Sequence, residues 1–143
     1  MKRDLLNNTK VLEAITHREL AENAAAVQSD AIDRQGFEGA VGEVHFSGMA
    51  GGVTGGSILV TLYEGDLADA LSASTDIRTY TFDADDKSGV IRVPYTGVKR
   101  FFAVNVDNNL TGGGAGTNTV NVSATALLGY PRSAPVAQDL AVE

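Results

Sequence analysis

The segment Thr119-Val-Asn-Val-Ser-Ala-Thr-Ala-Leu-Leu128 decides the fold class, because it alternates apolar and small polar residues along its whole length. Such alternation is typical of a β-strand with one buried face and one exposed face. The strand ends at Gly129-Tyr130-Pro131-Arg132, and another proline, Pro135, follows shortly after. We therefore expect a half-buried strand whose chain then leaves the domain as an extended arm.

Five further segments show strand patterns, namely Ala40–Met49, Ser57–Glu64, Ile77–Phe82, Gly89–Tyr95 and Arg100–Val106. Both faces of Ser57–Glu64 are largely apolar, which predicts cover on both sides or a subunit contact. Short strands with glycine between them and no long intervening helix are typical of an all-β domain. The sequence therefore predicts a mainly β fold, an antiparallel β-sandwich or a barrel-like domain.

The connections between these strands carry their own expectations. The glycine-rich stretch Gly48–Gly56 should be flexible unless something packs on it. The acidic stretch Asp83–Ser88 is typical of a hairpin turn between the strands on either side. The long loop Asp107–Asn118 separates two strands that we expect to pair antiparallel, and its glycines allow positive φ at little cost.

The N-terminal segment differs from the rest, since it contains neither glycine nor proline before residue 36. Its apolar residues fit a moderately amphipathic helix that begins near Asn8 or Thr9, which could serve as the N-cap. The alternatives are a frayed terminal segment or an arm that becomes ordered against a partner. We expect three parts: an N-terminal arm or helix (1–26), a β domain (27–132) and an extended C-terminal tail (133–143).

Composition excludes several classes of function. The 143 residues include no cysteine, which excludes disulfides, thiolate zinc sites and cysteine nucleophiles. A net charge of −7 repels polyanions, so nucleic acid is not an expected partner. No apolar stretch reaches the length of roughly 20 residues that a membrane-spanning helix needs, and no export signal is visible, so we expect a soluble protein without a membrane partner.

No motif in the sequence predicts catalysis or a cofactor. Gly112–Gly116 lacks the lysine and the following helix of a phosphate loop, which favours a flexible connection. The acidic run at Asp83 departs from a calcium loop, because Lys87 and Ser88 replace a ligand and the required glycine. His17 and His45 have no spaced companions for zinc binding or hydrolysis. We expect no enzyme activity, no metal and no cofactor.

Three phrases carry a resemblance to a known class of proteins. They are Asp33-Arg34-Gln35-Gly36-Phe37-Glu38-Gly39-Ala40, then Gly97-Val98-Lys99-Arg100-Phe101-Phe102-Ala103-Val104, and finally Ala126-Leu127-Leu128-Gly129-Tyr130-Pro131-Arg132-Ser133-Ala134-Pro135. Together they resemble capsid decoration proteins of tailed bacteriophages, also called cement or head-stabilising proteins. The resemblance covers about residues 31–136 and leaves the N-terminal segment unmatched.

The resemblance implies a structural virion protein that binds the outer surface of a capsid lattice and stabilises the expanded head. It would be made in the host cytoplasm, bind the major capsid protein and associate with copies of itself. Terminal segments outside a β domain can reach neighbours, so the expected contact residues lie near the two ends: Leu5, Leu6, Val11, Leu12, Ile15, Tyr130, Arg132, Pro135 and Val136. The alternatives are a neck or tail component of a phage and a carbohydrate-binding β-sandwich, which four scattered tyrosines and no tryptophan support weakly.

Overall fold

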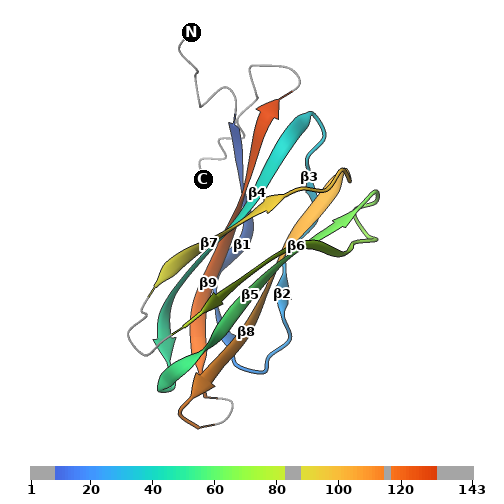
Figure 1. Ribbon diagram of the computed structural model, residues 1–143. Helices are drawn as coiled ribbons and strands as arrows, with labels where there is room; N and C mark the ends of the chain where they lie inside the picture. Colours follow the sequence, from blue (N-terminus) through green and yellow to red (C-terminus); the bar gives the residue numbers. More distant parts are fainter. Residues whose placement is uncertain (1–8, 83–87, 115–116, 132–143) are drawn as a thin grey trace, which may run out of the picture.

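The chain folds into two antiparallel β-sheets that pack face to face as a sandwich (Figure 1). The computed structural model describes residues 9–82, 88–114 and 117–131, and over these residues there is no helix and therefore no membrane-spanning helix. The predicted fold class is confirmed. The strands are β1 (Thr9–Ala21), β2 (Val27–Gln28), β3 (Ile32–Asp33), β4 (Phe37–Ala50), β5 (Val53–Gly65), β6 (Ser72–Thr81), β7 (Gly89–Tyr95), β8 (Phe101–Gly112) and β9 (Thr119–Pro131).

The strand order identifies a jelly roll. Sheet A has the order β1-β9-β4-β7, and sheet B has the order β2-β8-β5-β6, with β3 also pairing with β8. Val27 of β2 lies opposite Val106, and Ile32 of β3 lies opposite Phe102, so β2 and β3 form one interrupted strand along β8. With these two counted as one, the first of eight strands pairs with the last, the second with the seventh, the third with the sixth and the fourth with the fifth. This winding is that of the double-sheet jelly roll, which occurs in viral capsid, lectin and cupin domains.

Two predicted strand pairings are wrong. β6 and β7 lie in different sheets, so the acidic stretch between them does not close a hairpin. β8 and β9 also lie in different sheets, and the loop between them crosses the sandwich instead of joining two paired strands. Each strand has the expected local pattern, but the jelly roll sends most connections across to the opposite sheet, and no local pattern encodes that choice.

The predicted N-terminal helix is also wrong, because residues 9–21 form β1 at the edge of sheet A. β1 pairs with β9 from Thr9 opposite Gly129 to Ala21 opposite Thr119, so the sandwich begins at Thr9 and not near Val27. Register shifts lie between Glu13 and Ile15 and between Ile15 and Arg18. The extra residues at such irregularities break the strict alternation of a strand, so the apolar spacing resembles that of a helix.

The glycine-rich stretch 48–56 is not the flexible connection that we expected. Most of it belongs to the end of β4 and the start of β5, and only Gly51 and Gly52 connect the two strands. Gly56 has a φ of 96°, and a Cβ added there would collide with the carbonyl oxygen of Asn109 on β8. The glycine is therefore required where β5 and β8 approach closely.

The core lies between the two sheets and is mostly aliphatic, with one aromatic group toward each end. Near one end the rings of Phe46, Tyr80 and Phe82 lie 4.8–5.0 Å apart, centroid to centroid. Near the other end Tyr95 stacks on Phe102 at 5.4 Å. The fully buried aliphatic side chains between them are Val44, Ile58, Val60, Leu62, Val104, Val106, Val120 and Val122, with Leu128 and Leu110.

Candidate interaction surface

One end of the sandwich, at the top of Figure 1, holds both ends of the described chain and three connections. We call it the terminal end. β1 begins here, β9 ends here, and residues 34–36, 66–71 and 96–100 connect strands here. The three phrases that carry the phage resemblance meet at this end, since Asp33 lies opposite Phe101 and Gly39 lies opposite Gly129.

A partly buried hydrogen-bond network holds the 96–100 connection against the sandwich. The Arg34 guanidinium lies 5.2 Å from the centre of the Tyr95 ring and donates from Nε to the Lys99 carbonyl oxygen (2.5 Å). Tyr95 donates its hydroxyl to Oε2 of Glu64 (2.6 Å) and accepts from the backbone N–H of Lys99 (3.0 Å). Burial first, and then the hydrogen bond to Glu64, raise the pKa of Tyr95 to about 12. Tyr95 therefore stays neutral, and its hydroxyl holds the backbone of the 96–100 connection through Lys99.

Ion pairs tie the same connection to its neighbours from outside. Lys99 Nζ lies 2.6 Å from Oδ2 of Asp66 in the 66–71 connection, and this contact raises the pKa of Lys99. The Arg100 guanidinium donates to both carboxylate oxygens of Asp33, which lowers the pKa of Asp33. Each exposed pair contributes little stability alone. Together with the partly buried hydrogen bonds they link the connection to both of its neighbours.

This fixed connection displays an aliphatic side chain to solvent. Val98 is 86 % exposed, and Leu67, on the connection that Lys99 reaches through Asp66, is 63 % exposed. Aliphatic side chains held in place and surrounded by paired charges resemble the centre and rim of a protein interface. The terminal end is therefore a candidate interaction surface.

The outer face of sheet A near the terminal end carries a second apolar feature. Cross-strand register places Val11 beside Leu127, Leu127 beside Val41, and Val41 beside Pro94. We call this row, which runs across all four strands, the apolar strip. The next row on the same face is polar and consists of Glu13, Thr125, Glu43 and Arg92. An unbroken apolar row on an outer sheet face indicates a contact surface.

The predicted contact residues divide into three groups. Val11 and Tyr130 are exposed near the terminal end, at 58 % and 76 %. Leu12 packs partly against the core and Ile15 is buried within it, so neither is available to a partner, contrary to the prediction. The remaining five, Leu5, Leu6, Arg132, Pro135 and Val136, lie outside the described residues.

Tyr130 occupies an unusual backbone position for an aromatic residue. Its φ is 55°, and a Cβ added at Gly39 of the neighbouring strand would lie 2.9 Å from Tyr130 Cδ2. Gly39 thus leaves room for the ring, which rests against the backbone of β4. A non-glycine residue in this region of φ costs about 1–3 kcal/mol and is typically found where surrounding structure fixes it.

Sequence reasoning missed the most exposed contact candidates. Val98 lies within one of the phrases that carry the resemblance, but nothing in its neighbours predicts exposure. Val41, Leu127 and Pro94 form a row only through pairing between strands that are far apart in sequence. The available signal was the outward position of Val41 and Leu127 in their alternating strands.

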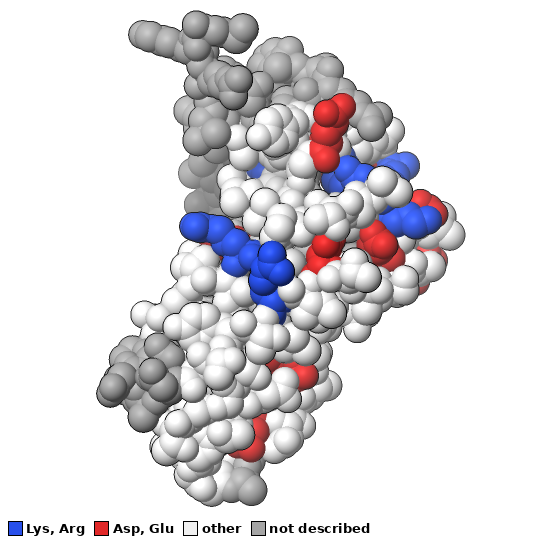
Figure 2. All heavy atoms as spheres, in the orientation of Figure 1, with Lys and Arg blue, Asp and Glu red and all other residues white. Residues whose placement is uncertain are grey.

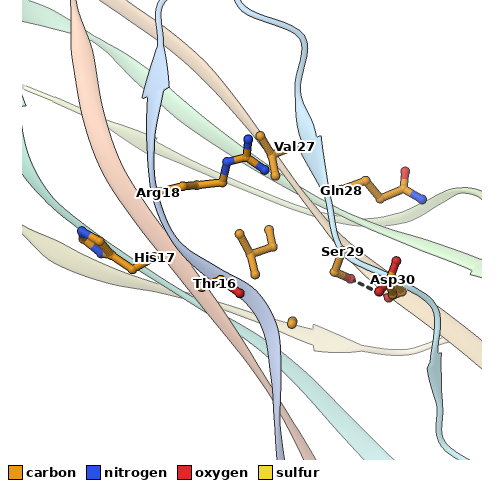
Figure 3. Close-up of a pocket in the computed structure, with 9 residues that line it drawn as sticks. Thr16, His17, Arg18, Val27, Gln28, Ser29 and Asp30 are labelled. Atoms are coloured by element: carbon orange, nitrogen blue, oxygen red, sulfur yellow. Dashed lines mark hydrogen bonds between the residues drawn. The ribbon is translucent and has the colours of Figure 1, made fainter.

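A depression of the described surface lies between β1 and the β2–β3 interruption (Figure 3). It measures about 380 Å³ and is lined by residues 14–18 and 27–30. His17 points away from Ser29 and Asp30, and the Ser29 hydroxyl donates to the Asp30 carbonyl oxygen. Its polar groups do not converge on a common point, so this depression has no catalytic arrangement.

The other sites weighed from sequence show ordinary structural contacts. His45 Nε2 lies 2.9 Å from Oε1 of Glu43, on the outer face of sheet A. Within the described residues no three histidine, aspartate or glutamate side chains form a group that could hold a metal. The acidic stretch 83–87 lies outside the described residues, as do residues 115 and 116. Asn118, after the glycine loop, is buried and donates to Glu22 (2.6 Å) and to the Gly112 carbonyl oxygen (2.8 Å).

Charge is unevenly distributed over the molecule. On the face seen in Figure 2, lysine and arginine lie in the upper two thirds, and the lower third shows neither. The connections at that lower end include Gly51 and Gly52 between β4 and β5, and Gly113 and Gly114 after β8. No continuous basic surface of the kind that binds nucleic acid is visible on this face.

Comparisons with known proteins give only distant structural similarity. No model of a protein family matches the sequence, and no curated protein matches it. Among solved structures, a chain from Bacillus endospore appendages, which are disulfide-linked pili, matches with a TM-score of 0.40 and 14 % identity, covering 90 % of this chain and 96 % of that one. A chain from deformed wing virus, a honeybee pathogen, matches with a TM-score of 0.43 and 10 % identity, covering 100 % of this chain and 54 % of that one.

Proposed function

We propose that this chain is a structural virion protein that binds the outer surface of a phage capsid lattice and stabilises the expanded head. The jelly roll supports this proposal, because it is an architecture that viral shell proteins use. The three resembling phrases support it further, since they form one surface at the terminal end. The proposed partner is the major capsid protein.

The observation that carries the proposal is that Val98 is exposed on a connection held in place by hydrogen bonds and ion pairs. The 96–100 connection is bonded to Arg34, Asp66 and Asp33, and yet its central aliphatic side chain is almost fully exposed. A surface loop that is ordered in advance loses little conformational entropy on binding. Residues 1–8 and 132–143 continue the chain from this same end, and they contain five of the contact residues expected from sequence.

The proposed mechanism is binding linkage and not catalysis. A protein that binds only the expanded lattice stabilises it in proportion to occupancy, by mass action. Many modest contacts on a repeating lattice then give firm retention. We propose no enzyme activity, no cofactor and no nucleic-acid or membrane partner. The −7 charge opposes polyanions, and the His45 ring contacts the Glu43 carboxylate on the outer face of sheet A.

The test is the copy number of this chain relative to the major shell subunit in purified particles, measured by quantitative peptide mass spectrometry. Hundreds of copies per particle support a lattice-binding decoration protein. A dozen or fewer indicate a neck or tail component and overturn the decoration proposal. Absence from particles overturns the virion proposal altogether.

A binding assay locates the contact. We expect Val98→Asp to reduce binding to expanded shells by at least about tenfold, because a buried unpaired charge opposes docking. Ile77→Asp, on β6 of sheet B and also exposed, is the matched control and should bind normally. Equal binding by both variants would contradict the assignment of the terminal end.

A further inference from the structure

We infer that the outer face of sheet A joins two copies of this chain around a two-fold axis parallel to the strands, apolar strip against apolar strip. The strip is Val11, Leu127, Val41 and Pro94, one residue from each strand of sheet A. In the row toward the terminal end, Gly129 and Gly39 stand side by side. The ring of Tyr130 lies against Gly39, so the apolar strip, and not this row, is the surface that a second sheet can approach.

The two-fold axis determines which residues face each other. Consider an axis that runs parallel to the strands, between β9 and β4. Rotation by 180° about it places β1 of one copy opposite β7 of the other, and β9 of one copy opposite β4 of the other. Each row of one copy then faces the same row of the other copy. Val11 then faces Pro94 of the second copy, and Leu127 faces Val41 of the second copy. The same surface meets itself, as an isologous contact requires.

Charge complementarity in the neighbouring row favours a second copy over another partner. The same exchange places Glu13 of one copy opposite Arg92 of the other, twice per dimer. Arg92 is 68 % exposed and uses only Nε on Glu43, so within the described residues both Nη groups lack an acceptor. The one described hydrogen bond to Glu13 comes from Thr16. The apolar strip therefore contacts the apolar strip of the second copy, and the polar row beside it contacts the polar row of the second copy.

Edge-to-edge pairing of sheets is a poor alternative, because each described edge is interrupted. β1 carries two register shifts, and the strand beside it in sheet B is broken into β2 and β3. β6 has a shift in its pairing with β5, and β7 contains Pro94. Such features prevent edge strands from pairing with another chain. Contact between two copies through a sheet face is therefore favoured over edge-to-edge pairing.

The dimer does not depend on the proposed virion function, although it would suit it. A two-fold axis parallel to the strands points both terminal ends in the same direction. Two copies could then bind one shell together, and the second contact would be favoured by the first.

The test is the association of the full chain, measured by sedimentation equilibrium and light scattering. We expect a wild-type dimer, and we expect Glu13→Arg and Arg92→Glu each to weaken it by at least about tenfold, because each places like charges in contact. An equimolar mixture of the two variants should restore dimers to within about threefold of wild type. Only mixed dimers bring opposite charges together at both contacts, the two substituted residues at one contact and wild-type Glu13 and Arg92 at the other.

Controls keep folding separate from association. Arg78→Glu, an exposed charge change on β6 of sheet B, should leave the dimer intact. Val11→Asp should give a folded monomer, with folding checked by circular dichroism. A monomeric wild-type chain, unchanged association of both charge variants, or a mixture that stays monomeric would each overturn the inference. Copy number in particles is a separate measurement, so failure of the dimer and failure of the virion proposal are distinguishable.

Discussion

Tyr95 shows how one buried polar residue organises a surface connection. Its hydroxyl joins the Glu64 carboxylate to the backbone of Lys99, and its ring separates Arg34 from Phe102 in the core. Because the neutral phenol is required for this arrangement, the pKa in the folded chain lies at about 12, above the ordinary value of 10.0. The stability that Tyr95 contributes is therefore complete below pH 10 and is lost as the pH rises toward 12.

We predict that phenolate absorbance contains a component with a midpoint near pH 12 that is missing from Tyr95→Phe. Tyr130→Phe, at an exposed position, should retain that component. The measurement is an ultraviolet titration of both variants, with folding followed in parallel. The same late component in Tyr95→Phe would show that Tyr95 is not the perturbed group.

Two neighbouring glycines provide a second prediction at this scale. Gly56 has a φ of 96° and lies against the backbone of Asn109, whereas Gly55 has no positive φ and its Cβ would lie 3.5 Å from Thr111 Oγ1. Gly56→Ala should lower the free energy of unfolding by about 2 kcal/mol or more, because strain and collision add. Gly55→Ala should change it by less than about 1 kcal/mol. Urea unfolding of both variants makes the comparison, and equal losses would contradict it.

At the scale of elements, β1 is the strand that sequence patterns do not identify. The alternation of β9 predicted its faces correctly. The buried residues are Val120, Val122, Ala124, Ala126 and Leu128, and the partly exposed residues that alternate with them are Asn121, Ser123, Thr125 and Leu127. β1 has the same role in the sheet, but its two register shifts give apolar spacing closer to that of a helix. Long-range pairing with β9 and burial of Ile15 and Leu20 override that local pattern.

We predict that Leu20→Ala lowers the free energy of unfolding by about 2–5 kcal/mol, because Leu20 is buried in the shared core. His17→Ala, exposed on the same strand, should change it by less than about 0.5 kcal/mol. The measurement is the urea midpoint at constant slope. An arm independent of the sandwich would unfold without affecting that midpoint, so no loss in Leu20→Ala would contradict the assignment of β1.

At the scale of the whole molecule, the jelly roll makes the last strand necessary for the first. β9 lies between β1 and β4 in sheet A, so its removal leaves both without a partner on that side. We predict that a chain of residues 9–131 folds with a cooperative thermal transition, and that a chain of residues 1–118 does not. Circular dichroism with thermal unfolding tests both.

The same truncation separates folding from the proposed function. The chain of residues 9–131 should lose most of its binding to expanded shells, because it lacks the two segments that continue from the terminal end. A folded 9–131 chain that binds shells as well as the full chain would remove residues 1–8 and 132–143 from the contact. The exposed Val98 and its connection would then have to account for all of the binding to shells.

The sequence by itself determined which segments form most strands and which residues of those strands face the core. Alternation is a property of neighbouring side chains, and it predicted most of β9, most of β5, the first half of β8 and the mainly β fold. The absence of cysteine likewise excluded disulfide links without any structure. Tertiary structure alone decided that β8 and β9 lie in opposite sheets, that residues 9–21 are a strand, and that Val11, Leu127, Val41 and Pro94 form one row. These features depend on which distant segments meet, and the free energy of that choice comes from pairing and burial across the whole chain, which no local pattern contains.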